Sequence, residues 1–374
     1  MAEYFIGLIS GTSMDGIDTV LVAFDHTGAH CVASHGHPIP HTVTEGLRKL
    51  ADPSQAACMD ELGSLDVALG EVLAEAVLCL LEDEHLDPSD IVAIGSHGQT
   101  VRHRPGGKPP FSLQIGCPHH LAERTGLTVV ADFRRRDIAA GGEGAPLVPA
   151  FHRAMMRSKT EDRVILNLGG IANITVLPAD EGAPLQGFDT GPANALMDAW
   201  IRHERGQPWD AQGDWAAGGE VDDPLLASML GDPYFMQPPP KSTGTEYFNL
   251  QWIKKQLQMA DRHIPARNVQ RTLAELTVAS ASDAIIRHAS SAQRVLVCGG
   301  GVHNRAVMEG LGRRLPNATV ESTEAVGLSP DWIEAMAFAW LARETLAGRP
   351  GNVPSVTGAR KAVVLGSIHP GEVV

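Results

Sequence analysis

The chain has 374 residues, a formal net charge of −14 and an apolar content of 43%. This length exceeds one typical hydrophobic core and predicts two domains, while the acidic balance disfavours nucleic acid and anionic membranes as partners. Five scattered cysteines, the absence of a long apolar run and a start without a secretion signal together predict a cytoplasmic protein with free thiols and no membrane span.

The predicted elements begin with a hairpin of two short apolar strands, residues 4–9 and 19–24, joined by a polar turn. Residues 60–83 keep one apolar stripe at the helical period and predict a helix. Residues 90–97 and 127–132 read as buried strands that end in polar side chains. Ligands of open α/β sheets gather where strands end in this way.

A change of composition over residues 133–150, which are rich in Arg, Gly and Pro, predicts a domain junction. Residues 163–178 then repeat the opening pattern of apolar strand, small polar tip and apolar strand, which is a weak internal repeat. We expect one lobe from residues 1–132 with about 345–374, and a second lobe from residues 133–344.

The second half of the chain contains a segment rich in Gly, Pro, Asp and Trp, residues 204–247, that we expect to cover a site or an interface. Residues 272–289 predict a helix, and residues 294–304 predict a strand that runs into a Gly-rich turn. Ser329 and Pro330 predict the start of another helix, with Ser as the N-cap and Pro at the first position.

Three Gly-rich tips follow apolar strands, at residues 10–16, 169–173 and 299–304. Glycine lets backbone N–H groups converge on phosphate oxygens, although Gly, Ser and Asp are also ordinary turn residues. The chain has no P-loop motif, and the third tip lacks the last glycine of the dinucleotide fingerprint. Three tips in one chain favour phosphate binding over plain turns.

The first tip adds hydroxyl and carboxylate groups to its glycines. Thr12 and Ser13 can donate hydrogen bonds to phosphate, whereas Asp15 and Asp18 are suited to hold Mg²⁺ through its waters. The first tip therefore predicts a site for a metal-bound polyphosphate.

Hairpins of this kind in two lobes resemble the ATPase superfamily of actin, hexokinase and Hsp70, and within it the anhydro-N-acetylmuramic acid kinases. The matching stretches include "IGLISGTSMDGID", "ADFRRRDIAAGGEGAPLVPAFH", "LNLGGIANIT", "GFDTGPANALMDAW", "DPYFMQPPPKSTGTEYFN", "VCGGGVHN" and "GNVPSVTGA", between residues 6 and 359. The resemblance implies an α/β, two-domain actin/hexokinase-like fold, a duplicated ribonuclease H-like fold with ATP in the interdomain cleft.

The family opens the 1,6-anhydro bridge of 1,6-anhydro-N-acetylmuramic acid with water and phosphorylates O6 with ATP, in peptidoglycan recycling. The products are N-acetylmuramic acid 6-phosphate and ADP. The resemblance implies ATP and Mg²⁺ as cofactors and a homodimer. It assigns nucleotide binding to Gly11, Thr12, Ser13, Met14, Asp15, Gly16, Ile17, Asp18, Gly169, Gly170, Asn173, Gly299, Gly300 and Gly301, and the metal to Asp15 and Asp18.

The reaction needs a carboxylate that takes a proton from water, and the resemblance gives this role to Asp189, with Thr190 and Asn194 assigned to the substrate. A glycosidase pairs such a base with an acid for the leaving oxygen. In the family's reaction the leaving oxygen bonds to the phosphoryl group instead of to a proton. The alternative is that Asp189 caps a helix over residues 192–201.

Arg134, Arg135 and Arg136 form the only tight basic run, and arginine binds carboxylates such as the lactyl group of the substrate. We expect one or two of them to contact the substrate. The alternative is surface pairing with Asp132 or Asp137.

Glu334 is assigned a catalytic role on the resemblance, although an exposed helical glutamate is a common alternative. His97 is assigned to the substrate, and His103 lies in the same stretch, "SHGQTVRH"; for both, a structural role is the alternative. The alternative function for the chain is a conventional sugar or carboxylate kinase of the same superfamily, in which Asp189 deprotonates a substrate hydroxyl and no water is consumed.

Overall fold

The computed structural model describes residues 2–11, 14, 16–52, 54–56 and 58–371. The chain divides into two compact units: unit 1 contains Met1–Met155 and Trp332–Val374, and unit 2 contains Met156–Asp331. The sequence instead places the boundaries after residues 132 and 344. The difference arises because nearly all of α5 and most of α12, which lie in the predicted second lobe, pack within unit 1.

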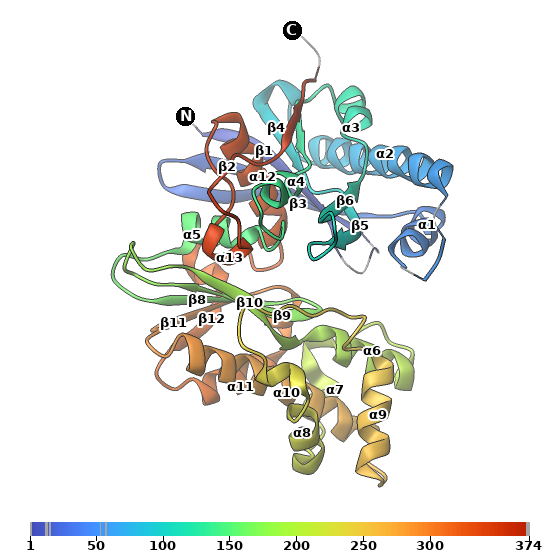
Figure 1. Cartoon of the computed structure of the whole chain (residues 1–374), viewed down its shortest axis with the longest axis vertical. Coiled ribbons are helices and arrows are strands. Elements are labelled where there is room, and N and C mark those ends of the chain that lie inside the picture. Colours follow the sequence, from blue (N-terminus) through green and yellow to red (C-terminus); the bar gives the residue numbers. More distant parts are fainter. Residues whose placement is uncertain (1, 12–13, 15, 53, 57, 372–374) are drawn as a thin grey trace. The chain divides into compact units, whose positions relative to one another are not determined.

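Unit 1 is built on a six-stranded sheet with the order β13-β7-β4-β1-β2-β3 (Figure 1). Its strands are β1 (Glu3–Ser10), β2 (Gly16–Asp25), β3 (Gly28–Pro38), β4 (Ile91–Ser96), β7 (Val129–Ala131) and β13 (Ser367–His369). The first three strands run antiparallel, β4 and β7 run parallel to β1, and β13 closes the edge antiparallel to β7. The predicted opening hairpin and the two predicted buried strands are confirmed.

Helices and one small hairpin surround this sheet. The helices of unit 1 are α1 (His41–Ala51), α2 (Met59–Asp83), α3 (Pro118–Thr125), α4 (Arg135–Ala139), α5 (Val148–Met156), α12 (Ile333–Leu346) and α13 (Pro354–Thr357), with a 3₁₀ turn η1 (Pro88–Asp90). The hairpin consists of β5 (Gln99–Arg104) and β6 (Phe111–Ile115). The predicted apolar stripe of α2 is buried at Leu69, Leu73 and Leu80.

Helix α12 lies directly against the middle of the sheet because two neighbouring strands carry glycine there. Gly7 of β1 is paired with Gly95 of β4. A Cβ atom on Gly7 would lie 1.9 Å from the carbonyl oxygen of Ala335, and one on Gly95 would lie 2.0 Å from that of Phe338. Only glycine permits this approach of helix backbone to strand backbone.

Unit 2 repeats the strand plan of unit 1 in a five-stranded sheet with the order β10-β9-β8-β11-β12 (Figure 1). Its strands are β8 (Arg163–Leu168), β9 (Ile171–Leu177), β10 (Gln186–Pro192), β11 (Arg294–Cys298) and β12 (Thr319–Ser322). Again the first three run antiparallel, and the last two run parallel to the first. The shared topology confirms the internal repeat and the predicted duplicated α/β fold.

Most of the helices of unit 2 pack against α10, which is buried along most of its length. The helices of this unit are α6 (Asn194–Arg205), α7 (Asp214–Ala217), α8 (Asp223–Leu230), α9 (Leu250–Ala260), α10 (Ala266–His288) and α11 (Arg305–Arg314), with 3₁₀ turns η2 (Ala211–Gly213), η3 (Pro233–Met236), η4 (Gly300–His303) and η5 (Thr323–Val326). The helix predicted over 272–289 is confirmed and begins earlier.

The predicted helix start at Ser329 and Pro330 is wrong. Helix α12 begins at Ile333, and its N-cap residue Trp332 makes no side-chain cap hydrogen bond. The carbonyl oxygen of Pro330 instead accepts a hydrogen bond of 2.8 Å from the N–H of Gly299, so the Ser-Pro stretch anchors the turn after β11.

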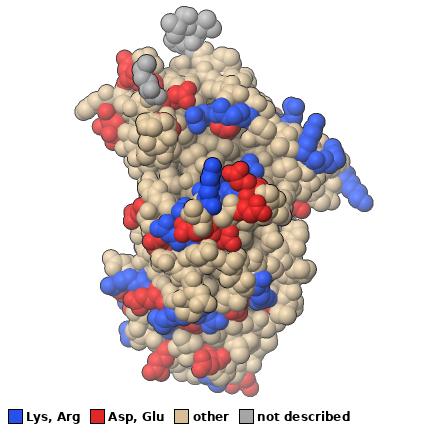
Figure 2. Space-filling model, turned by 90° about the vertical axis from the view of Figure 1, so that its left-hand side faces the viewer, with Lys and Arg blue, Asp and Glu red and all other residues tan. Residues whose placement is uncertain are grey.

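Within the parts of the chain that the structure describes, no helix combines the length and apolar character needed to cross a bilayer. On the face that Figure 2 shows, uncharged residues cover most of the surface, and acidic and basic side chains are interspersed. The excess of acidic residues is therefore not gathered into one patch on this face.

We expect Gly7→Ala to destabilise unit 1, because the added methyl group would overlap the carbonyl of Ala335. Overpacking of this kind costs about 1–3 kcal/mol. Urea denaturation followed by circular dichroism measures the free energy of unfolding. Gly36→Ala on β3 is the matched control, because its methyl group would meet nothing within 4 Å. Equal stabilities of the two variants would contradict the close packing of α12.

Candidate functional site

Asp189 lies on the last strand of the antiparallel part of unit 2, and a distant segment holds it there. The backbone N–H of Asp189 donates to the carbonyl oxygen of Lys241 at 3.1 Å. The N–H of Thr243 donates to Asp189 Oδ2 at 3.0 Å, and the hydroxyl of Tyr234 donates to the backbone oxygen of Asp189 at 2.8 Å. The carboxylate therefore has a fixed position with one oxygen bonded to backbone.

The segment that holds Asp189 is the aromatic and Pro-rich stretch 232–248. Lys241 lies over the ring of Tyr234, with Nζ 4.5 Å from the ring centre, and donates to the Tyr234 carbonyl at 3.2 Å. The sequence left open whether this stretch serves an interface or covers a site. Its contacts with Asp189 favour a role at the site.

Burial raises the pKa of the Asp189 carboxyl to about 6, although the Thr243 N–H and the Lys241 ammonium act in the opposite direction and Glu246 adds to the rise. A base of this strength is well matched to proton transfer near neutral pH. The alternative that Asp189 caps a helix is wrong, because Asp189 lies inside β10 and the N-cap residue of α6 is Ala193.

The second tip, between β8 and β9, is held by the start of α6. The N–H groups of Asn194 and Ala195 donate to the carbonyls of Gly169 and Gly170 at 3.0 and 3.1 Å, and Asn194 Nδ2 donates to the carbonyl oxygen of Leu168 at 2.8 Å. Cβ atoms on the two glycines would meet nothing closer than 3.6 Å. Packing does not require glycine here, which fits a backbone that a ligand approaches.

Two other predicted site residues of this sheet have defined partners or neighbours. Thr190 is buried, and its hydroxyl donates to the carbonyl oxygen of Ala172 at 3.3 Å. Asn173 is half-buried on β9 and is paired in register with Asp189. Thr190 therefore faces the core and ties β10 to β9, whereas Asn173 lies beside the candidate base.

The third tip combines one open glycine with two that packing requires. Gly299 has a φ of +79°, and its Cβ would lie 2.5 Å from Asn167 Oδ1; a Cβ on Gly301 would lie 2.5 Å from Leu168 Cβ. Gly300 has space, with Asn194 Nδ2 3.8 Å from a Cβ atom there. The turn thus lies against the end of β8 and leaves Gly300 open.

The first tip is described only in part. Thr12, Ser13 and Asp15 lie outside the described residues. Of the other predicted residues there, Asp18 is half-buried on β2 opposite Ile9, and Gly16 and Ile17 begin that strand. Gly11 accepts a hydrogen bond of 3.1 Å from the N–H of Met14, whose φ of +55° is unusual for a residue other than glycine. Met14 is thus tied back to the residue that follows β1.

His97 and Arg134 form one unit in unit 1. Arg134 Nε and Nη2 lie 3.1 and 2.9 Å from His97 Nε2, and Arg134 Nη1 donates to the carbonyl oxygen of Gly144 at 3.0 Å. His97 Nδ1 lies 3.0 Å from the carbonyl oxygen of Gly98. Burial and the charge of Arg134 lower the pKa of His97 to about 3, so the neutral ring accepts from the guanidinium.

The other two arginines of the run have different surroundings. Arg135 is exposed and forms an ion pair of 2.6 Å with Asp132, as the alternative interpretation allowed. Asp137 is buried and is held by Asn352 and Thr357, whose side chains donate to Oδ1 at 2.6 and 2.8 Å. Asp137 is therefore a structural anchor for the loop after α4. Arg136 is exposed on α4.

Glu334, in the first turn of α12, lies close enough to Arg134 for their charges to interact. Its side chain reaches solvent, yet the protein atoms packed around the carboxyl raise its pKa, and Arg134 acts in the opposite direction. Burial lowers the pKa of Arg134 to about 10, and Glu334 opposes this change. Unit 1 therefore brings together three predicted site residues that lie far apart in the sequence, His97, Arg134 and Glu334.

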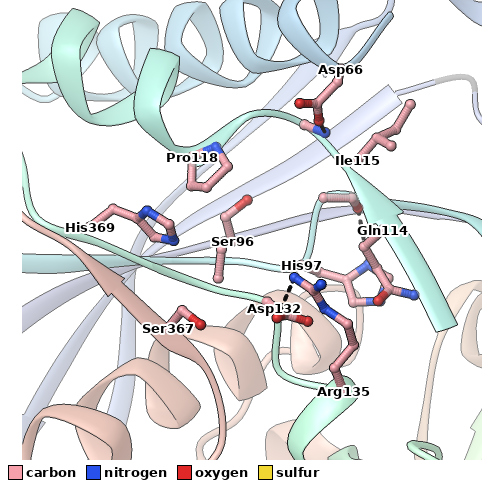
Figure 3. Close-up of a pocket in the computed structure, with 13 residues that line it drawn as sticks. Asp66, Ser96, His97, Gln114, Ile115, Pro118, Asp132, Arg135, Ser367 and His369 are labelled. Carbon is pink, nitrogen blue, oxygen red and sulfur yellow. Dashed lines mark hydrogen bonds and ion pairs between the residues drawn. The ribbon is translucent and has the colours of Figure 1, made fainter. Parts of the chain in front are cut away.

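A pocket of about 140 Å³ lies beside this group in unit 1 (Figure 3). Its lining includes His97, the Asp132–Arg135 ion pair and Ser96, whose buried hydroxyl has no hydrogen-bond partner among the residues described. Asp132 has a φ of +60° directly after β7. Polar groups from separate strand ends thus meet at one small pocket, as the sequence predicts for such ends.

Comparison with known proteins identifies the family. The family model described as anhydro-N-acetylmuramic acid kinase matches residues 3–371. A curated protein of that name from Coxiella burnetii, strain Dugway 5J108-111, is 50% identical over 370 residues, which cover 99% of this chain and 98% of the relative. The protein of the same name from strain RSA 493 / Nine Mile phase I gives the same values.

The chain belongs to the anhydro-N-acetylmuramic acid kinase family. Among solved structures, it resembles component A of the (R)-2-hydroxyglutaryl-CoA dehydratase of Acidaminococcus fermentans, with 10% identity, a TM-score of 0.48 and coverage of 92% of this chain and 99% of the other. For a ROK family glucokinase from Streptomyces griseus, the values are 14%, 0.40, 91% and 99%.

Several positioning residues of this family member escape analysis of the sequence alone. Tyr234, Lys241 and Thr243 hold Asp189, while Asn352 and Thr357 hold the loop next to the arginines. They lie in stretches that carry the family resemblance, which is the one signal that singles them out. Their partners are distant in sequence, so no local pattern reveals what they contact.

We expect Lys241→Met to raise the pKa of Asp189 further, because the ammonium that favours the charged carboxylate is lost. Titration of the Asp189 carboxyl carbon by NMR measures the midpoint directly. Lys255→Met, on the exposed face of α9, is the matched control and should leave the midpoint unchanged. A midpoint that stays the same in both variants would show that Lys241 does not act on Asp189.

Proposed function

We propose that the protein uses ATP to convert 1,6-anhydro-N-acetylmuramic acid into N-acetylmuramic acid 6-phosphate. Membership of the family across nearly the whole chain, at 50% identity to a curated member, carries the proposal. We also propose a cytoplasmic location, because a peptidoglycan-recycling reaction that consumes ATP needs the ATP of the cytoplasm.

Asp189 is proposed as the general base. It takes a proton from a water molecule whose oxygen bonds to the anomeric carbon, while the bond from that carbon to O6 breaks. O6 then bonds to the γ-phosphorus, and ADP leaves. The fixed position of Asp189 and its pKa of about 6 support this role, because the carboxylate is ionised at neutral pH and remains basic enough to accept a proton.

The three Gly-rich tips are proposed to bind ATP. The open space at Gly169, Gly170 and Gly300 fits backbone that phosphate or ribose oxygens can approach. Mg²⁺ would neutralise phosphate charge during transfer, and Asp18, a half-buried carboxylate on β2, is a suitable residue to hold its waters. Asp15 is the other carboxylate proposed for the metal.

Arg134 is proposed to bind the lactyl carboxylate of the substrate. His97 and the Gly144 carbonyl fix the orientation of its guanidinium, so little side-chain freedom is lost on binding. Arg135 already has Asp132 as a counter-ion, which weakens the electrostatic attraction between Arg135 and a second carboxylate. Glu334 is proposed to tune this cluster through its interaction with Arg134.

The decisive experiment is mass spectrometry of the product formed from ATP and 1,6-anhydro-N-acetylmuramic acid in ¹⁸O-labelled water. The proposal predicts a gain of one water and one phosphoryl unit, with the label at C1. A phosphorylated product with its anhydro bridge intact and no label would instead establish a conventional sugar kinase.

We expect Asp189→Asn to lower turnover by about 10²–10⁴-fold, because the amide cannot accept the proton. In the unchanged protein, kcat/KM should fall as the pH falls through about 6, where the carboxylate becomes protonated. Asp198→Asn is the matched control, because burial also raises the pKa of Asp198 to about 6 but no site role is assigned to it. A normal rate in Asp189→Asn would exclude it as the base.

We expect Arg134→Gln to raise the KM for the sugar by about 10- to 100-fold, the usual effect of losing hydrogen bonds to a charged group. The KM for ATP should change little. Arg136→Gln, on the short helix α4 that begins directly after Arg134, is the matched control. An equal rise in both KM values for Arg134→Gln would argue against a carboxylate contact.

A homodimer is also proposed, on the family resemblance. Met236 of η3, 76% exposed, is an apolar side chain available for such a contact. Sedimentation of the purified chain measures the oligomeric state, and a monomer at micromolar concentration would contradict this part of the proposal.

A further inference from the structure

A cluster of metal-ligand residues lies in unit 1, at residues to which the proposed kinase reaction assigns no role. In the described part of the chain, His35, His37 and Cys79 each offer one ligand atom, and these atoms lie within 4.8 Å of one another. The two histidines are on β3, two residues apart and thus on one face of the strand, and Cys79 is on α2, which packs against β3.

The separation of the two rings suits a shared metal ion. His35 Nε2 lies 3.3 Å from His37 Nδ1. Two nitrogens on a tetrahedral zinc ion lie about 3.3–3.4 Å apart when each Zn–N bond is about 2.0–2.1 Å. The sulfur has to come to about 3.6 Å from each nitrogen, which the half-buried Cys79 achieves by a small side-chain shift.

The outer nitrogens of both rings face carboxylates. His35 Nδ1 lies 3.3 Å from Asp83 Oδ2, and His37 Nε2 lies 3.8 Å from Glu75 Oε2. Metal-bound histidines usually donate their second N–H to a carboxylate, which fixes the tautomer that presents the free lone pair to the metal. Glu75, Cys79 and Asp83 are spaced four residues apart on α2, so they line the same side of the helix.

The charges around the cluster are compatible with a bound zinc ion. One thiolate and two neutral rings on Zn²⁺ leave one positive charge, which the carboxylates of Asp83 and Glu75 offset.

We propose that His35, His37 and Cys79 bind a zinc ion that joins the edge strand β3 to helix α2, with Asp83 and Glu75 as outer partners of the two rings. Imidazole with thiolate is a ligand set for zinc rather than for magnesium or calcium. With three protein ligands, a water molecule would occupy the fourth coordination position of the zinc ion. The ion would hold an edge strand that pairs with the sheet on one side only.

The test uses the full-length protein, stripped with a chelator and then given Zn²⁺ or Co²⁺ alone. We expect one zinc ion per chain to remain after gel filtration and the thermal midpoint to rise by about 4 °C in excess zinc. The cobalt form should show thiolate-to-metal charge-transfer absorption. Cys79→Ser should abolish that absorption, whereas Cys31→Ser on β3 and Cys58→Ser before α2 should retain it.

A second pair of variants tests the outer partners. Glu75→Gln should weaken zinc binding about tenfold, because the tautomer of His37 is less firmly held, whereas Glu82→Gln on the same helix should bind as the unchanged protein does. His37→Gln should lose the bound ion. Absence of zinc from the unchanged protein, or loss of the cobalt absorption in Cys31→Ser as readily as in Cys79→Ser, would overturn the proposal. Neither outcome bears on the proposed kinase reaction.

Discussion

The contact between α12 and the central strands of unit 1 sets the geometry of everything near it. Because Gly7 and Gly95 lie side by side, helix backbone and strand backbone approach to a distance that no side chain would allow. The distance between the helix and the sheet is therefore fixed. Its first turn carries Glu334, whose charge interacts with Arg134, and Phe338 packs against the ring of His97. A steric constraint between one helix and two strands thus determines which charges meet in a polar cluster.

Unit 2 fixes the position of Asp189 by hydrogen bonds from a distant segment rather than by close backbone packing. A stretch about fifty residues further along the chain contributes one backbone donor to the carboxylate and one tyrosine hydroxyl to its backbone. Burial by this stretch raises the pKa of the carboxyl, while its amide and ammonium groups limit the rise. Burying a carboxylate costs stability unless it is partnered, and here the partners leave it charged at neutral pH.

Much of the fold was predictable because the spacing of apolar residues along the chain indicates which face of a helix or strand is buried. The two hairpins, the long helix α2 and the strand that leads into η4 follow from short apolar runs or the helical period, whereas the duplicated fold was implied by the family resemblance. The start of α12 was not predictable, since the Pro330 carbonyl is taken by Gly299, a partner thirty-one residues away. The candidate site shows the same contrast between residues that sequence reveals and contacts that only the fold creates. Asp189 and the arginine run stand out in sequence, whereas the pairing of His97 with Arg134 depends on tertiary contacts alone.

The division of unit 1 into two stretches of chain has a consequence for how the protein is made. Residues 156–331 form a continuous unit, so their sheet can close as soon as they have emerged from the ribosome. The strands that contain Gly7 and Gly95 are synthesised earlier, but the helix that covers them is translated only after the whole of unit 2. Until then, one face of that sheet remains without its cover. Unit 2 can therefore complete its fold before the unit whose first strands are synthesised ahead of it.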